Sequence, residues 1–102
     1  MRIYISGAIT NDPDHMKKFA RADEKLTQEG WEVMNPALIG SCFPKSTTHS
    51  EFMKLSFLEL ELCDAVYFLN GWKSSTGACM EYGFAYAKDM ILMFEEEKKE
   101  GE

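Results

Sequence analysis

The sequence has no apolar run of the roughly 18 residues that a membrane-spanning helix needs. Its first ten residues, MRIYISGAIT, are too few and too polar to form a secretory signal. We therefore expect a cytoplasmic protein with no membrane partner.

Positive charge is also scarce, because 11 Lys and Arg residues face 17 Asp and Glu residues, giving a net charge of −6. This balance argues against a nucleic acid polymer as a partner. Five of the acids lie in the final segment EEEKKEGE. Since 102 residues suit a single domain, we expect one domain over residues 1–94 and an acidic, solvated tail over residues 95–102.

Cysteine and histidine are few. Cys42, Cys63 and Cys79 form no C-x-x-C pair, and neither His15 nor His49 stands at metal-ligand spacing from them. We expect reduced structural thiols, no metal site and no redox cofactor.

The apolar patterning predicts four strands. The first is RIYIS, which ends at Gly7, and the second is WEVM, which stops at Asn35 and Pro36. The third, AVYFL, is apolar throughout, which is typical of a central parallel strand covered on both faces. The predicted strands are residues 2–6, 31–34, 65–69 and 90–94.

Three helices are expected between the strands. Asp12 as N-cap and Pro13 as first residue are expected to open the first helix, which Gly30 closes. A capping box of Thr48 and Glu51 opens the second. The third runs over residues 77–88, and residues 35–48 are expected to form one long loop.

The second helix, roughly residues 49–62, carries two further points. Its segment LELEL alternates like a strand, although the cap and the length favour a helix. As a helix it is apolar around most of its circumference, which favours packing against another subunit. We therefore expect a homodimer or a larger homo-oligomer.

The order of elements predicts a small, doubly wound α/β fold, flavodoxin- or Rossmann-like, with a four-stranded parallel sheet and helices on both faces. Such sheets bind ligands at the carboxyl ends of their strands, where the strand order switches. That edge should gather residues 6–10, 35–36 and 70–77.

A glycine-rich phosphate loop is absent, because neither G-x-G-x-x-G nor G-x-x-x-x-G-K-[ST] occurs. Instead, three hydroxyl residues, 74–76, lead into Gly77 at a helix start, with Lys73 beside them. Hydroxyls and free N–H groups at a helix N-terminus bind anions. Ser75 or Thr76 could equally serve as a plain helix cap, and the two roles are compatible.

Glu81 is a lone acid among small and aromatic residues, four positions after Gly77 and on the same helix face. At a strand-end crevice it could act as a nucleophile or a general acid–base; elsewhere it would be an ordinary solvated side chain. Tyr4 either reaches the same crevice or packs in the core. Trp72 either stacks on a base or covers the core.

Three segments resemble the nucleoside 2-deoxyribosyltransferase-like family, above all its small phage and bacterial members. They are IYISGAIT (3–10), LCDAVYFLNGW (62–72) and SSTGACMEYGFAYA (74–87), and the likeness covers nearly the whole chain up to the acidic tail. The most specific element is G-x-x-x-E-x-G.

The resemblance implies cleavage or transfer of the N-glycosidic bond of a 2-deoxynucleoside or its 5′-monophosphate. Glu81 would be the nucleophile that forms a glycosyl-enzyme, in the manner of a retaining glycosidase. Tyr4 would position it, and Ser6 and Gly7 would lie under the sugar. The ligand would be a small nucleoside or nucleotide, with no cofactor.

Two positions depart from the usual transferase pattern, in which acids stand where this chain has Ser75 and Ser56. Serine at position 75 resembles deoxynucleoside 5′-monophosphate N-glycosidases, which favours a monophosphate substrate with Ser75 and the Gly77 backbone at its 5′ end. By the same resemblance, Ser56 stands where the transferases carry an acid that contacts the substrate.

Two alternatives stay open. A non-catalytic nucleotide- or sugar-binding sensor would keep the fold but would not need Glu81 within reach of Tyr4. A purely oligomer-forming protein would fill the strand-end crevice with side chains.

Overall fold

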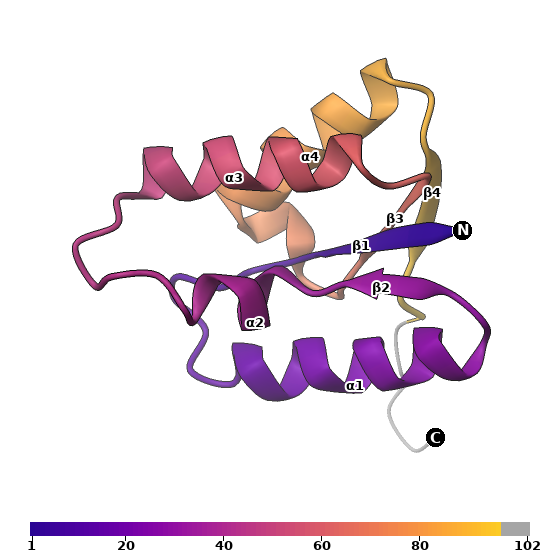
Figure 1. Cartoon of the computed structure of the whole chain (residues 1–102), viewed down its shortest axis with the longest axis horizontal. Coiled ribbons are helices and arrows are strands. Elements are labelled where there is room, and N and C mark those ends of the chain that lie inside the picture. Colours follow the sequence, from indigo (N-terminus) through magenta and orange to yellow (C-terminus); the bar gives the residue numbers. More distant parts are fainter. Residues whose placement is uncertain (97–102) are drawn as a thin grey trace.

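The computed structural model describes residues 1–96 and has a three-layer α/β arrangement (Figure 1). A four-stranded, all-parallel sheet lies between two helical layers and has the strand order β2-β1-β3-β4. The strands are β1 (Arg2–Ser6), β2 (Glu32–Met34), β3 (Ala65–Phe68) and β4 (Ile91–Phe94). The predicted doubly wound parallel sheet is confirmed.

Four α-helices and one short 3₁₀ helix connect the strands. They are α1 (His15–Gln28), α2 (Pro36–Gly40), α3 (His49–Glu61), η1 (Trp72–Ser74) and α4 (Thr76–Ala87). In Figure 1, α1 and α2 lie below the sheet, and α3 and α4 lie above it. The connection from β2 to β3 crosses over β1, so α3 lies on the opposite face from α1.

The alternation of side chains along the central strands divides the core in two. Ile3 and Ile5 of β1 face α1 and α2, where they pack with residues such as Phe19 and Leu26. Tyr4 faces the other way and packs in a second cluster with Leu60 of α3 and Ala85 of α4. Residues of β1 with even numbers therefore point toward α3 and α4.

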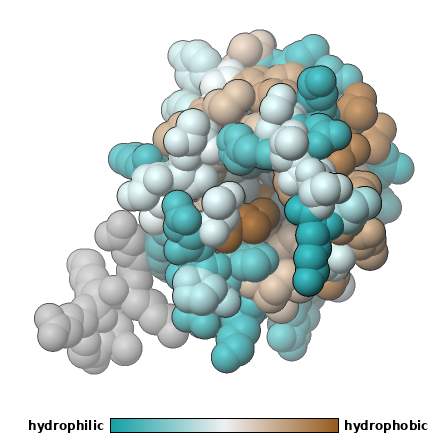
Figure 2. All heavy atoms as spheres, turned by 90° about the vertical axis from the view of Figure 1, so that its left-hand side faces the viewer, coloured by the Kyte–Doolittle hydropathy of each residue, from teal (hydrophilic) through white to brown (hydrophobic). Residues whose placement is uncertain are grey.

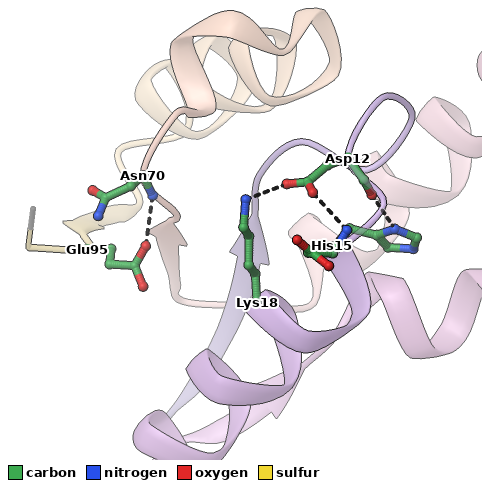
Figure 3. A network of polar contacts seen from close by, with 6 residues as sticks. Asp12, His15, Lys18, Asn70 and Glu95 are labelled. Atoms are coloured by element: carbon green, nitrogen blue, oxygen red, sulfur yellow. Dashed lines mark hydrogen bonds and ion pairs between the residues drawn. The ribbon is translucent and has the colours of Figure 1, made fainter.

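The predicted start of the first helix is wrong by a few residues. The helix begins at His15, and the Asp12 carboxylate instead accepts hydrogen bonds from the Asp14 backbone N–H at 2.9 Å and from Lys18 Nζ at 2.7 Å. His15 Nδ1 donates to the Asp12 carbonyl oxygen at 2.9 Å (Figure 3). Asp12 thus fixes the loop that precedes the helix.

The prediction of one long loop over residues 35–48 is also wrong, because α2 forms within it. Asn35 is its N-cap, since the Asn35 side-chain oxygen accepts from the N–H groups of Ala37 and Leu38 at 3.1 and 3.4 Å. Pro36 takes the first helical position, where its missing N–H costs nothing.

The second predicted helix is confirmed. The Thr48 hydroxyl accepts from the Glu51 backbone N–H at 3.1 Å, and the Glu51 carboxylate accepts from that of Thr48 at 2.9 Å, which completes the capping box. The LELEL segment is helical through Glu61. Leu58 and Leu62 are 62% and 56% exposed, so part of its apolar surface remains uncovered in the single chain.

The predicted tail over residues 95–102 falls mostly outside the described residues. Its first two residues do not extend freely from the sheet. The Glu95 carboxylate accepts from the Asn70 N–H at 2.9 Å, and the Asn70 side chain donates to the Glu96 carbonyl at 3.2 Å. The former contact is drawn in Figure 3.

Candidate functional site

A cavity of about 500 Å³ opens at the carboxyl ends of the strands. Residues from the end of β1, the start of α1, α2, α3 and the first turns of α4 line it. Figure 2 looks onto this edge and shows an apolar hollow surrounded by hydrophilic residues. The connection from β1 leads to β2 on one side, and the next connection crosses back over β1 to β3 on the other side. The cavity lies at the point where the strand order reverses in this way.

The buried Glu81 carboxylate is the polar centre of this cavity. Tyr4 donates its phenolic hydroxyl to Glu81 Oε2 at 2.5 Å, and Ser6 donates its hydroxyl to Oε1 at 2.7 Å. Glu81 is only 5% exposed, yet it borders the cavity. Both carboxylate oxygens are therefore fixed by hydroxyl donors from one strand.

The local sequence explains this convergence. Tyr4 and Ser6 are two positions apart on β1, so both side chains point to the same face, toward α4. Glu81 lies four residues after Gly77, which brings it to the cavity face of α4 one turn inside the helix. The predicted proximity of Glu81 and Tyr4 is present.

Burial dominates the electrostatics of the pair. It raises the pKa of Glu81 above the ordinary value for a carboxyl group, while the hydroxyls of Tyr4 and Ser6, with a smaller contribution from Ser56, act in the opposite direction. Burial first, and then the Glu81 charge, raise the pKa of Tyr4 well above 10.0, so the phenol stays protonated and remains a donor.

The N-terminus of α4 forms another part of the wall. Ser75 is its N-cap and accepts from the Ala78 N–H at 3.2 Å, so the capping role considered for it is present. Both Ser75 and Gly77 line the cavity. A Cβ on Gly77 would lie 3.3 Å from Met53 Sδ and 3.6 Å from His49 Nε2, so glycine lets α3 approach closely.

The remaining predicted site residues divide into two groups. Gly7 and Ser56 line the cavity. Ser6 does not, because it is 1% exposed and lies behind Glu81, so it supports the carboxylate and is not at the cavity surface.

Trp72 lies apart from the cavity. It stacks on Tyr82 with ring centroids 4.9 Å apart and packs on Phe68, beside a second hollow of about 560 Å³ at the β3–β4 side. Lys73 lies over the Trp72 ring, 5.9 Å from its centroid, and lines the same second hollow. Of the two proposed roles for Trp72, the structure supports covering the core.

Three ionisable residues that line the cavity were not predicted from the sequence as site residues: Glu59, His15 and His49. Glu59 is half-buried, and burial together with the neighbouring Glu81 charge raises its pKa to about 7. Its position could have been inferred from the spacing of three residues that separates it from Ser56 on one helix face.

Within residues 1–96, no group of three or more His, Cys, Asp or Glu side chains is arranged to hold a metal ion. The three cysteines are all free thiols. No helix in this part of the chain is both long and apolar enough to cross a membrane.

Comparison with known protein families places the chain in one of them. A search of the curated proteins finds nothing similar to this sequence. One family profile matches residues 1–94, which comprise the sheet and all the helices that form the cavity. The chain therefore belongs to the family described as Domain of unknown function (DUF4406).

Proposed function

We propose that the protein cleaves or transfers the N-glycosidic bond of a 2-deoxynucleoside, or of its 5′-monophosphate, with Glu81 as the nucleophile. The proposal joins the sequence resemblance to the geometry of the cavity. Attack of a Glu81 oxygen on the anomeric carbon would displace the base and form a glycosyl-enzyme, which water or a second base then resolves.

The observation that carries the proposal is the pair of hydroxyl donors on Glu81. Tyr4 and Ser6 hold the two carboxylate oxygens at 2.5 and 2.7 Å, so the group has one orientation at the edge of the cavity. A fixed carboxylate in a site of low dielectric stabilises an oxocarbenium-like centre strongly. A solvated surface glutamate would have neither the burial nor the donors.

The cavity itself is compatible with a nucleotide. Its volume of about 500 Å³ falls within the usual range for small-molecule sites. Its wall combines aromatic side chains, such as Phe43 and Phe52, with the Ser75 hydroxyl and the Gly77 backbone at the start of α4. In this arrangement the 5′-phosphate would lie at the helix N-terminus and the base against the aromatic side.

A second candidate is a nucleotide- or sugar-binding sensor without catalysis. The observation in its favour is that hydroxyls stand at positions 56 and 75, where the resembled transferases carry acids. The retained Tyr4–Glu81 contact supports the enzyme over the sensor, since binding alone does not require it. The presence of an open cavity likewise speaks against a purely oligomer-forming protein.

The test is base release from a panel of 2-deoxynucleosides and their 5′-monophosphates, with a second free base as acceptor. Wild type should release base, and Glu81→Gln should not, because an amide cannot form the glycosyl-enzyme. Base exchange would indicate a transferase. A matched control is Glu24→Gln on the exposed side of α1.

Ligand binding by both Glu81→Gln and wild type, without base release from any substrate, would refute catalysis and support the sensor. Thermal melting of each variant checks that it is folded.

A further inference from the structure

We infer that Glu59 is the general acid–base of this site, donating a proton to the departing base and later accepting one from the incoming water or acceptor base. The inference rests on the proposed function of Glu81. It assigns a second catalytic carboxylate that the sequence resemblance does not supply.

The first argument is the position of Glu59 on α3. One face of this helix borders the cavity, and it includes His49, Met53, Ser56 and Glu59. These positions step by three or four residues, as one helix face requires. The neighbouring Leu58 is 62% exposed and points elsewhere. Glu59 therefore belongs to the wall that α3 presents to Glu81.

The second argument is the charge environment. The ionisable groups that face Glu59 are Glu81 from α4, Tyr4 from β1 and Cys63 just after α3. None of the three is cationic. Burial and the Glu81 carboxylate raise the pKa of Glu59 to about 7. Burial likewise raises the pKa of the Cys63 thiol to about 11, so it stays neutral.

The two carboxyl groups differ in their hydrogen bonds, and this divides their roles. Glu81 receives hydroxyl donors on both oxygens, which favour its ionised form. Among residues 1–96, no side chain or backbone group donates a hydrogen bond to the Glu59 carboxylate, although the Leu62 N–H donates to the Glu59 backbone carbonyl. When the two carboxyl groups share one proton, Glu59 is the protonated member of the pair, and Glu81 is the anionic nucleophile.

The chemistry balances with these two residues and the substrate alone. In the first step a Glu81 oxygen forms a bond to C1′ while the C1′–N bond breaks, and the Glu59 proton goes to the base. In the second step water or an acceptor base attacks C1′ and gives its proton to Glu59, while the bond from C1′ to Glu81 breaks. Both residues return to their starting protonation states.

The experiment compares wild type, Glu59→Gln and the control Glu61→Gln, whose side chain lies on an exposed position of the same helix. Base release is measured with the full chain as kcat/KM from pH 5 to 9. The substrates share one sugar and carry bases of decreasing pKa, ending with a base that leaves readily without protonation. Thermal melting confirms that the variants are folded.

We expect the wild-type kcat/KM to fall as the pH rises through about 7, because the acid form of Glu59 is lost. Glu59→Gln should lose this limb and react about 10²- to 10⁴-fold more slowly with ordinary bases. The difference in kcat/KM between Glu59→Gln and wild type should become smaller as the leaving base becomes more acidic. A purely structural role would slow all the substrates equally.

Two results would overturn the inference. Suppose that wild type releases base and that Glu59→Gln has the same pH profile and the same dependence on the leaving base as wild type. Glu59 is then not the acid, although Glu81 remains the nucleophile. If wild type releases no base from any substrate, the proposed function fails and the inference fails with it.

Discussion

Tyr4 and Glu81, separated by 77 positions in the sequence, are joined by a hydrogen bond of 2.5 Å in the interior of the protein. The bond connects the first strand of the sheet to the last helix, across the face that α3 and α4 cover. Burial and the Glu81 charge raise the pKa of Tyr4, so the phenol is protonated and donates, and this hydrogen bond acts against the rise that burial causes in the pKa of Glu81. The carboxylate therefore depends on Tyr4 for part of its stabilisation in the ionised form.

The first prediction concerns Tyr4→Phe. Loss of the phenolic donor should raise the pKa of Glu81 further, because this hydrogen bond lowers it. If ionised Glu81 is the nucleophile, the acidic limb of kcat/KM should move to higher pH. A hydrogen bond to a charged group contributes about 1.5–3 kcal/mol, so we expect the rate to fall about 10- to 100-fold.

The measurement is the pH profile of base release, with Tyr67→Phe as the matched control. Tyr67 is another buried strand tyrosine, but it packs in the cluster on the opposite face, with Ile3 and Ile5. Its variant should keep the wild-type profile. An unshifted acidic limb in Tyr4→Phe would show that the phenol does not tune Glu81.

The centre of the site was predicted only in part. The family resemblance paired Glu81 with Tyr4, but Ser6 was expected under the sugar and instead donates to Glu81 without lining the cavity. Alternation along a five-residue strand places Tyr4 and Ser6 on one face, and helical spacing relates Gly77 to Glu81. Parallel strands with helical connections then bring the carboxyl ends together at one edge. The shared edge and the helical spacing follow from local periodicity and topology, whereas the roles of Glu81 and Tyr4 were implied by the family resemblance.

The surroundings of this centre were less predictable, because they depend on packing between elements. The spacing from Ser56 indicates which helix face carries Glu59, but the LELEL segment does not indicate how deeply that residue is buried, because this depends on how α3 packs. Trp72 is the first residue of η1, just after the turn that follows β3, and it packs against the aromatic rings of Phe68 and Tyr82. A loop residue has no periodicity from which to infer its face.

The start of α4 leads to the second prediction, on Ser75→Ala. The variant loses the hydrogen bond from the Ala78 N–H, which should cost about 1 kcal/mol of stability. If Ser75 also holds a 5′-phosphate, KM for deoxynucleoside monophosphates should rise, while KM for free deoxynucleosides should change little. Steady-state kinetics with both substrate types tests this difference.

Thr48→Ala is the control for helix capping. Thr48 caps α3 through the Glu51 N–H at 3.1 Å and does not line the cavity, so its loss should cost similar stability without distinguishing the two substrate types. If Ser75→Ala raises KM equally for both substrate types, Ser75 caps the helix and does not hold the 5′-phosphate.

The third prediction uses stability alone and needs no substrate. The pKa of Glu59 is raised from 4.5 to about 7 in the folded protein, so the native state binds a proton that the unfolded state has released between these values. By linkage, the contribution of this group to the free energy of unfolding is fully present below pH 4.5 and is lost as the pH rises through about 7. Glu59→Gln has no such loss.

As the pH rises from 5 to 8, the melting temperature of wild type should therefore fall relative to that of Glu59→Gln. The difference should be no more than a few degrees, because Glu59 is only half-buried and solvent screens its charge. Glu61→Gln, on an exposed position of the same helix, should follow wild type across this range. Parallel curves for Glu59→Gln and wild type would mean that Glu59 ionises as an ordinary surface carboxyl, and its coupling to Glu81 would then be too weak for it to hold the proton of the pair.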